Sequence, residues 1–340
     1  MKTIELRNSF GIDSLVLADR PKPAPGPGEI LLKVNAVSLN YRDLRVVEGI
    51  FFPQLPLPFV PASDAAGQIE EIGSGVTRFK PGDRATAHFI QNWERGPFNH
   101  TILSGGYLAA TLGGPLPGVL SEYVVLPEGG VVATPSYLND EQAATLPIAA
   151  LTAWEALRLG SLQPGQTVLV QGTGGVSIFA LQLAKALDAR VIITSSSDEK
   201  LQRAAKLGAD VTVNYRTDPK WWQTVKAATD GLGVDHVVDV GGSDTLNHSL
   251  KALKPAGFVA VIGMLTGTEC KLDVLSFLLL NARIQSLTVG SRQSFEEMNA
   301  FLVKHPVHPV VDEVFSWNQT VDAFRQLKAA KHFGKIVLRP

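Results

Sequence analysis

The sequence of 340 residues has little of several features that mark particular classes of protein. It holds one cysteine, Cys270, which excludes an intramolecular disulfide and any metal site built from several thiolates. Its 31 lysines and arginines nearly balance 32 aspartates and glutamates. The resulting net charge of -1 gives no electrostatic reason to expect a nucleic acid or an anionic membrane as partner. We therefore expect a small-molecule partner.

Long apolar runs and a targeting segment are also lacking. The longest apolar run, 274–280, is interrupted by Ser276 and is far shorter than the roughly 20 residues of a membrane-spanning helix. Residues 1–19 show no basic start followed by an apolar stretch, so no signal peptide is predicted. These observations predict a cytoplasmic protein.

The composition itself is that of an ordinary globular protein, with 45% hydrophobic and 19% charged residues. The length is about twice the usual domain size of roughly 150 residues, which predicts two domains. Up to about residue 126 the chain is rich in glycine and proline. Short β-type segments at 29–34, 66–72 and 120–125 are separated there by turn signals, which indicates a mostly β domain without long helices.

After residue 165 apolar strands alternate with amphipathic helices, which predicts an α/β domain with a doubly wound parallel sheet. From about 294 we expect helix, strand, helix and a final strand that returns to the β domain. The domains are thus predicted as 1–126 with 294–340, and 127–293. The expected elements after 165 are strands at 167–170, 190–194, 210–213, 237–240, 257–262, 285–289, 310–315 and 335–338, and helices at 176–187, 198–206, 294–304 and 318–330.

A glycine-rich turn joins the first of these strands to its helix, the context that a dinucleotide-binding fingerprint requires. Glycine lets the backbone turn tightly and approach a pyrophosphate, while the N–H groups at the helix start favour its negative charge. Ser177 stands at the third glycine position, so the fingerprint is imperfect. The predicted cofactor-binding residues of the turn are Gly172, Thr173, Gly174, Gly175 and Val176.

The end of the second strand bears on the choice of nicotinamide cofactor. An acidic residue there would bind the ribose 2′-hydroxyl and repel a 2′-phosphate. The strand instead ends with Thr194-Ser195-Ser196-Ser197, followed by Asp198-Glu199-Lys200. Hydroxyl and ammonium groups can receive a phosphate, so NADP(H) is predicted to be preferred over NAD(H). The alternative, which can coexist with a phosphate site, is that Ser196 caps the next helix and Glu199 completes a capping box.

Several motifs, in a fixed order along nearly the whole chain, resemble the medium-chain dehydrogenase/reductase superfamily. Within it the chain is most similar to the zinc-independent quinone oxidoreductase and alcohol-dehydrogenase-like branch. This resemblance implies a GroES-like catalytic domain, a Rossmann domain, a cleft between them, and a homodimer or homotetramer. The motifs are Leu39-Asn40-Tyr41-Arg42-Asp43-Leu44, Val76-x-x-Phe79-x-Pro81-Gly82-Asp83-Arg84, Leu151-Thr152-Ala153-Trp154, the turn at 172–176 and Gly334-Lys335-Ile336-Val337-Leu338.

The resemblance also shows where zinc-dependent relatives hold their metal. Their cysteine ligand falls on Asn40, and their Gly-His-Glu run falls on Ala62, Ser63 and Asp64. Their four-cysteine structural site has no counterpart in a chain whose single cysteine is Cys270. Since a catalytic zinc needs about three ordered protein ligands, no bound zinc is predicted.

Without a metal, the substrate oxygen must be polarised by hydrogen bonds, and the Asn40 amide and Tyr41 hydroxyl are the predicted donors. The alternative is that Asn40 caps the loop and Tyr41 packs over it. Because charge spreads over a conjugated system, NADPH-dependent reduction of quinones or of activated enones and carbonyls is favoured. The alternatives are a metal-free NAD(P)-dependent alcohol dehydrogenase or aldehyde or ketone reductase, and a non-catalytic NADPH-binding protein.

Other segments contribute further candidates. The loop 89–118, with Trp93, Phe98 and Tyr107, suits a substrate-pocket wall, or its aromatic residues form local core. Thr152 falls where the family's interdomain helix approaches the nicotinamide, and other candidates follow strand ends, where they face the cofactor or form only a turn. The further cofactor-binding candidates are Thr152, Tyr215, Gly241, Gly263, Ser291 and Lys335.

Overall fold

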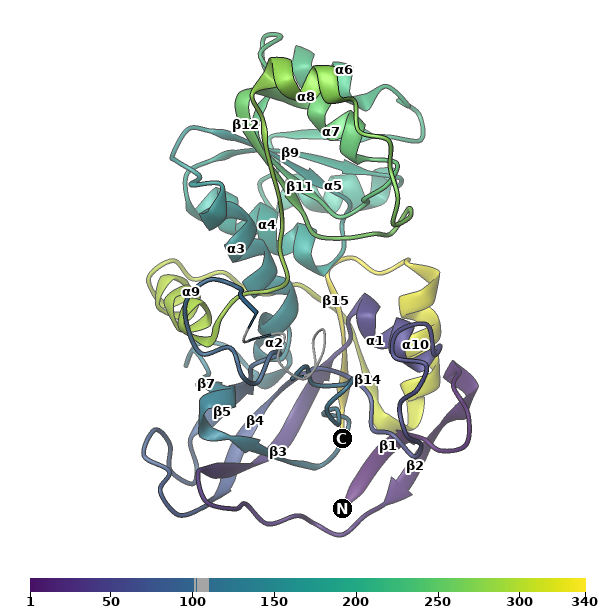
Figure 1. Cartoon of the computed structure of the whole chain (residues 1–340), viewed down its shortest axis with the longest axis vertical. Helices are drawn as coiled ribbons and strands as arrows, with labels where there is room; N and C mark the ends of the chain where they lie inside the picture. Colours follow the sequence, from purple (N-terminus) through teal and green to yellow (C-terminus); the bar gives the residue numbers. More distant parts are fainter. Residues whose placement is uncertain (101, 103–109) are drawn as a thin grey trace. The chain divides into compact units, whose positions relative to one another are not determined.

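The computed structural model describes residues 1–100, 102 and 110–340, which form two compact units (Figure 1). The first unit contains Met1–Leu151 and Gly290–Pro340, and the second contains Thr152–Val289. Tyr107 lies outside the described residues. In the part of the chain that the structure describes, none of the helices is both long and apolar enough to cross a membrane.

The first unit is built on a mostly antiparallel sheet with the strand order β14-β15-β3-β4-β5-β7, in which β6 also pairs with β3. The long strand β3 lies at its centre, and the final strand β15 pairs antiparallel with it through Val337 and Leu338. The predicted return of the last strand to the β domain is therefore confirmed. The strands of this sheet are β3 (Glu29–Ser38), β4 (Asp64–Ile72), β5 (Arg84–Ala87), β6 (Tyr123–Pro127), β7 (Val131–Ala133), β14 (Val311–Ser316) and β15 (Lys335–Arg339).

Close pairing of β3 with β4 requires a glycine. Gly67 lies opposite Val34, where the register of the two strands shifts. A Cβ atom at Gly67 would lie 1.9 Å from the Lys33 carbonyl oxygen, which no side chain can tolerate. Beyond the shift, β3 continues to Ser38, where it pairs with Asp64, the first residue of β4.

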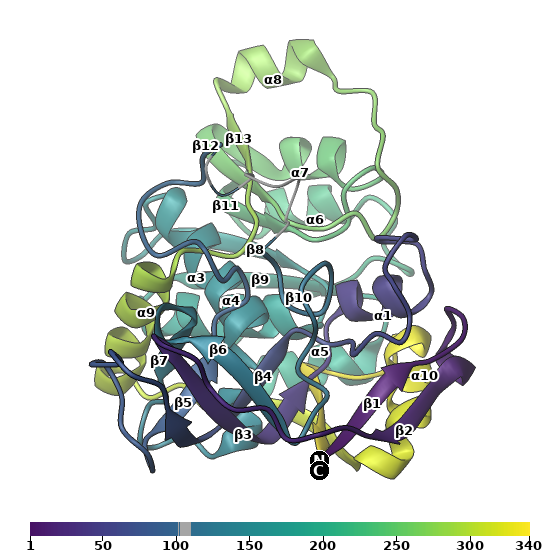
Figure 2. The ribbon, with the colours of Figure 1, turned by 60° about the horizontal axis from the view of Figure 1, so that its bottom comes forward.

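Helices and a short hairpin complete the first unit, and Figure 2 shows the hairpin strands β1 and β2 beside α10. Helix α1 contacts α10, and α9 contacts β7. The additional elements are β1 (Lys2–Leu6), β2 (Leu15–Asp19), α1 (Tyr41–Val47), α2 (Asp140–Ala143), α9 (Arg292–Lys304) and α10 (Thr320–Ala329).

The second unit has a parallel sheet with the strand order β10-β9-β8-β11-β12-β13. When the six strands are numbered along the chain, their order across the sheet is 3-2-1-4-5-6. This is the doubly wound order, in which the chain adds strands first on one side of the first strand and then, from the fourth strand on, on the other side. The six predicted strands are all present. They are β8 (Thr167–Gln171), β9 (Arg190–Ser195), β10 (Val211–Asn214), β11 (Val234–Asp239), β12 (Leu253–Val261) and β13 (Arg283–Ser286), accompanied by α3 (Leu151–Leu159), α4 (Gly175–Ala186), α5 (Asp198–Lys206), α6 (Trp221–Ala227), α7 (Leu246–Ala252) and α8 (Val274–Leu280).

The structure corrects two expectations from the sequence. Residues 127–151, predicted to belong to the parallel-sheet domain, pack with the first unit because β7 pairs with β5 and α2 contacts β3 and β4. Ser197, not Ser196, caps α5, since its backbone is extended and its Oγ accepts a hydrogen bond from the Lys200 N–H at 3.4 Å. The cap is the residue directly before the first helical residue, Asp198.

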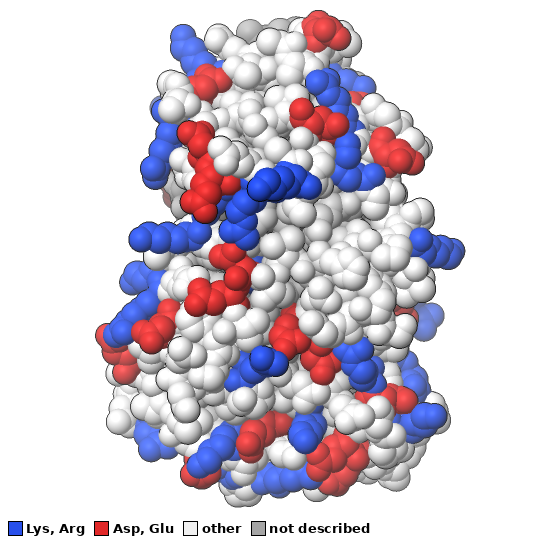
Figure 3. All heavy atoms as spheres, turned by 180° about the vertical axis from the view of Figure 1, so that it is seen from behind, with Lys and Arg blue, Asp and Glu red and all other residues white. Residues whose placement is uncertain are grey.

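The two units carry mixed charge. On the face in Figure 3, lysine and arginine side chains are interspersed with aspartate and glutamate side chains. This distribution agrees with the near balance of acidic and basic residues in the sequence.

His88, which directly follows β5, is fully buried. Both its ring nitrogens lack a hydrogen-bond partner among the described residues. Burial, opposed by the Trp93 backbone and assisted by the nearby charge of Arg292, lowers the pKa of His88 to about 3. The imidazole is therefore neutral in the folded protein, and protonation is linked to unfolding.

This depressed pKa predicts acid sensitivity. The stabilising contribution of neutral His88 is complete above its unfolded pKa of 6.5 and is lost as the pH falls towards 3. Across that window it amounts to about 1.4 kcal/mol per pH unit. We expect His88→Leu to make the free energy of unfolding, measured with urea at a series of pH values, depend less steeply on pH. His100→Leu, a change at an exposed histidine, is the control, and equal slopes for both variants would contradict this prediction.

Candidate functional site

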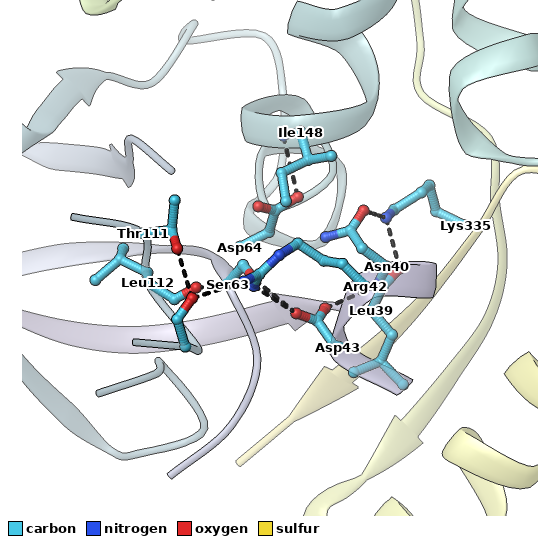
Figure 4. Close-up of polar contacts among 11 residues, drawn as sticks. Leu39, Asn40, Arg42, Asp43, Ser63, Asp64, Thr111, Leu112, Ile148 and Lys335 are labelled. Atoms are coloured by element: carbon cyan, nitrogen blue, oxygen red, sulfur yellow. Dashed lines mark hydrogen bonds and ion pairs between the residues drawn. The ribbon is translucent and has the colours of Figure 1, made fainter. Parts of the chain in front are cut away.

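A cluster of buried polar side chains forms in the first unit, where β3 ends and α1 begins (Figure 4). Asn40 is the N-cap of α1 and has an extended backbone. Its backbone N–H donates to Asp43 Oδ2 at 2.8 Å, so Asp43 reaches back to the helix start as in a capping box. Asp43 therefore has a structural task at this helix, and Asn40 is held in a defined backbone position.

Arg42 connects α1 to two other segments of the first unit. Its guanidinium donates from Nη1 to the Leu112 carbonyl oxygen at 2.9 Å and from Nη2 to the Gly114 carbonyl oxygen at 2.8 Å. Nη1 also donates to Ser63 Oγ, which in turn donates to Asp43 Oδ1 at 2.5 Å. The Ser63 hydroxyl thus has both a donor and an acceptor partner.

Lys335 enters the same cluster from β15 (Figure 4). Its Nζ is buried and donates to the Leu39 carbonyl oxygen at 2.6 Å and to Asn40 Oδ1 at 2.5 Å. Asp64, the first residue of β4, is fully buried, and its Oδ2 accepts from the Ile148 N–H at 3.2 Å. The Asn40 amide lies between the ammonium and the carboxyl group.

The charges of this cluster are shifted by burial. Burial raises the pKa of Asp64 to about 7, although the charge of Lys335 and the Asn40 amide oppose the rise. Burial lowers the pKa of Lys335, and the charges of Asp64 and Asp43 oppose that change. Each buried charge therefore depends on its neighbours of opposite sign to remain charged.

The residues at the positions where zinc-dependent relatives hold their metal do not fit a zinc ion. Asn40 Oδ1 accepts from an ammonium group, and Ser63 Oγ lies between a guanidinium and a carboxylate. Two cations, the partly buried Arg42 and the buried Lys335, would repel a divalent ion at this place. In residues 1–100, 102 and 110–340, no group of three or more histidine, cysteine, aspartate or glutamate side chains could hold a metal ion.

Tyr41, the second predicted donor, has a different environment from Asn40. Its side chain is 41% exposed, whereas Asn40 is 8% exposed. The guanidinium of Arg45 lies over the Tyr41 ring, 5.6 Å from its centroid. The structure therefore places Asn40 inside the buried cluster and Tyr41 at the solvent-exposed start of α1.

The loop that follows β5 is joined to α9. Two backbone carbonyl oxygens of the loop, those of Trp93 and Glu94, accept from the first N–H groups of α9 at 2.9 Å each. Trp93 is buried and makes an edge contact with Phe98 at 5.2 Å between ring centroids. Ser291, a predicted cofactor residue, caps α9 by accepting from the Ser294 N–H at 3.2 Å.

The glycine-rich turn in the second unit fits a phosphate group. Gly172 has a φ of +74°, which favours glycine, and Gly174 is the N-cap of α4 with no side-chain cap. A Cβ at Gly174 would meet no atom within 4 Å, so the turn is open there. The first N–H groups of this 12-residue helix can bind an anion. The hydroxyl of Ser177 donates to the Gln171 carbonyl oxygen at 2.7 Å, which accounts for serine at the third glycine position.

Four of the predicted cofactor residues lie at or next to the end of β9. Ser195 is buried, and its carbonyl oxygen accepts from the Tyr215 N–H at 3.1 Å. Ser196 is half-buried, and Lys200 lies in the first turn of α5. The hydroxyl and ammonium groups of a phosphate site are thus present at the strand end where a ribose would be recognised.

The remaining candidates have packing reasons for their residue type. A Cβ at Gly241 would lie 2.4 Å from Thr245 Oγ1, and one at Gly263 would lie 2.1 Å from the Val240 carbonyl oxygen. Thr152 is buried within α3.

The roles of Arg42 and Ser63 and the partners of Asp64 were not predicted from the sequence. The only signal for them was the motif at 39–44, because the partners lie far apart in sequence.

The comparisons with known proteins agree with this architecture. Residues 26–136 match the family model "Alcohol dehydrogenase GroES-like domain", and residues 175–304 match "Zinc-binding dehydrogenase". The zinc-type alcohol dehydrogenase-like protein C1773.06c of Schizosaccharomyces pombe is 43% identical, covering 92% of this chain and 91% of that protein. The chain belongs to the medium-chain dehydrogenase/reductase superfamily. Within it, the protein is an alcohol dehydrogenase-like oxidoreductase.

Other similar proteins differ in their named activities. Acryloyl-coenzyme A reductase of Metallosphaera sedula is 31% identical, covering 93% of each chain. A crystal structure of a putative alcohol dehydrogenase from Sinorhizobium meliloti has a TM-score of 0.92 and 42% identity, covering 100% of this chain and 99% of that one. A structure of an NAD-dependent alcohol dehydrogenase has a TM-score of 0.90 and 35% identity. A structure of a mycobacterial protein complexed with NADPH has a TM-score of 0.82 and 27% identity. Both alignments cover 100% of this chain and 100% of the other chain.

The hydrogen bonds of Arg42 predict a large stabilising role. Arg42→Leu would leave buried Asp43 without its cation and the Leu112 carbonyl oxygen without its donor, and it would remove one of the two donors to the Gly114 carbonyl oxygen. We expect a loss of about 3 to 5 kcal/mol in the free energy of unfolding, measured with urea. Arg45→Leu on the same helix is the control, because Arg45 pairs with Glu48 at a partly exposed site and its removal should change stability by about 1 kcal/mol or less. Similar losses for both variants would contradict the role of Arg42.

Proposed function

We propose that this protein is an NADPH-dependent, zinc-independent oxidoreductase that reduces quinones or activated enones and carbonyls by hydride transfer. The observation that carries the proposal is the buried Asn40 amide, held beside Lys335 at the position where zinc-dependent relatives place a metal ligand. A hydrogen-bond donor there can stabilise negative charge on a substrate oxygen. The similarity to an acryloyl-coenzyme A reductase supports a conjugated substrate.

The chain's own residues have separate tasks in this reaction. The turn at 172–176 and the end of β9 bind the dinucleotide, which supplies the hydride when it is bound. The Asn40 amide donates to the substrate oxygen as hydride adds to the conjugated carbon, so charge that develops on the oxygen is stabilised. The positive charge of Lys335 on the other side of the amide polarises the amide further. A proton from solvent then completes the reduction.

A turnover screen tests the proposed function. The protein is supplied with NADPH and, in separate assays, with quinones, enones, aldehydes and ketones, and with NADP⁺ and secondary alcohols. We expect turnover of quinones or enones that persists after prolonged chelation. Turnover of simple alcohols and ketones alone would favour the metal-free alcohol dehydrogenase, and NADPH binding without any turnover would favour a non-catalytic binding protein. Loss of activity on chelation with recovery on adding zinc would overturn zinc independence.

The preference for NADPH rests on the residues at the end of β9. No acidic residue stands within the strand end Thr194 to Ser197, and Lys200 lies one turn into the next helix. We expect Lys200→Glu to weaken NADPH far more than NADH, because it places a negative charge near the 2′-phosphate. Fluorescence titration with both cofactors measures the change. Lys206→Glu, the same charge change at the last residue of α5, is the control. Equal affinities of the unmutated protein for NADPH and NADH would refute the preference for NADPH.

The donor role of Asn40 and Tyr41 makes a kinetic prediction. One well-aimed donor to an oxyanion contributes on the order of 3 kcal/mol, or about a hundredfold in turnover. Asn40→Ala and Tyr41→Phe each remove one donor, so each should lower kcat while the Kd for NADPH stays nearly unchanged. A change confined to KM would indicate uniform binding of substrate and transition state. Near-normal turnover in both variants would refute the donor role.

A homodimer is the proposed assembly. Four apolar side chains of α8 are more than half exposed, and α8 precedes β13, the edge strand of the parallel sheet (Figure 2). An exposed apolar face beside an open sheet edge favours association. We expect Leu275→Lys with Leu279→Lys to shift the mass in analytical ultracentrifugation from dimer to monomer. Leu17→Lys, on β2 of the first unit, is the control, and an unchanged mass in all three proteins would contradict the prediction. The apolar residues of α8 are Val274, Leu275, Leu278 and Leu279.

A further inference from the structure

We propose that Lys335 is a positioning residue whose ammonium group sets the orientation of the Asn40 amide, so that the amide N–H groups and not its oxygen are presented to the substrate. This inference deepens the proposed function and rests on it. The substrate class it implies is one with an acceptor oxygen, such as a quinone or an enone carbonyl.

The orientation follows from the chemistry of the partners. An ammonium group can only donate hydrogen bonds, so the amide atom at 2.5 Å from Lys335 Nζ has to be the oxygen. Asp64 lies on the other side of the amide, and Figure 4 shows the amide nitrogen turned towards it. A carboxylate accepts, so both neighbours favour the same orientation of Asn40.

Lys335 is itself held firmly in its place. Its side chain is buried, and a second hydrogen bond, to the Leu39 carbonyl oxygen at 2.6 Å, keeps Nζ beside the end of β3. Because β15 pairs with β3 at Val37 and Ser38, the backbone that carries Lys335 is fixed to the strand that leads into Asn40. The contact between the two side chains therefore joins β15 to the start of α1, two residues after the end of β3.

The amide nitrogen of Asn40 is the group left for a ligand. Asn40 is more than nine-tenths buried. Its Nδ2 faces the Asp64 carboxyl group and lowers the pKa of that group, but no described residue accepts from Nδ2 at hydrogen-bond distance and angle. A buried donor without an acceptor is unfavourable, and an incoming carbonyl or quinone oxygen would satisfy it. Without the ammonium group, the amide could rotate by half a turn and present its oxygen, which would repel the substrate oxygen.

The resemblance to dehydrogenases suggests a different task for Lys335, binding of the cofactor. The two tasks predict different kinetic effects. A residue that binds cofactor phosphate affects the Kd for NADPH, whereas a residue that orients Asn40 affects kcat and acts only while Asn40 is present. The experiment therefore has to measure both constants in variants of both residues.

The test compares four proteins: the unmutated chain, Asn40→Ala, Lys335→Met and the double variant. For each, kcat is measured with the best acceptor of the screen, and the Kd for NADPH by fluorescence titration. We expect Lys335→Met to lower kcat about tenfold to a hundredfold with the Kd unchanged, and to have no further effect when Asn40 is already alanine. A raised Kd with unchanged kcat, or effects that add in the double variant, would overturn the proposal.

Removal of one buried charge endangers folding, so a second set of variants is needed. Asp64→Asn combined with Lys335→Met removes one charge of each sign, and the matching control is Asp64→Asn alone. If both proteins keep the melting temperature of the unmutated chain, we expect kcat to be about tenfold to a hundredfold lower in the double variant than in Asp64→Asn alone. Normal turnover of Asn40→Ala would refute the proposed donor role itself. Loss of turnover in Asn40→Ala but not in the Lys335 variants would refute only the positioning role.

Discussion

The first unit depends on the mutual compensation of four ionisable side chains around the start of α1. The partly buried Arg42 and the buried Lys335 lie among two buried carboxyl groups, those of Asp43 and Asp64. Each charge would be unfavourable in an apolar interior by itself, and their mutual attraction and hydrogen bonds offset the loss of water. The arrangement brings α1, β4, the segment 112–114 and β15 together. The Asn40 amide nitrogen faces Asp64 but has no acceptor at hydrogen-bond distance and angle among the described residues, and the proposed chemistry occurs there.

How much could be predicted from the sequence depended on the distance between interacting residues. The strands β8 to β13 were predicted because strands covered on both faces are nearly all apolar. The assignment of residues 127–151 failed because β7 has three residues and gives no periodic signal of its own. Asn40 was found through its motif, but its contact with Lys335 joins residues 295 positions apart, which no local pattern reveals. The cap at Ser197 was misplaced by one residue among three adjacent serines.

In the proposed reaction, the two units bind the cofactor and the substrate through different kinds of interaction. In the second unit, backbone N–H groups at an uncapped helix start serve a phosphate, so glycine and small residues suffice. In the first unit, the proposed active group is a side-chain amide, and we propose that charged neighbours set its orientation. Substitutions in the glycine-rich turn would therefore act through backbone conformation, and substitutions in the buried cluster would act through electrostatics.

The chain order of the first unit has a consequence for folding during synthesis. Thr152–Val289 is inserted between the two parts of the first unit, so the second unit can fold as one continuous segment when it leaves the ribosome. The first part already contains Arg42, Asp43 and Asp64, but their remaining cation, Lys335, is made only after the whole inserted unit. Until then Asp64 lacks the neighbouring positive charge that opposes the rise of its pKa. A nascent chain would thus hold an incomplete charge cluster, and the arrival of β15 would close both the sheet and the site.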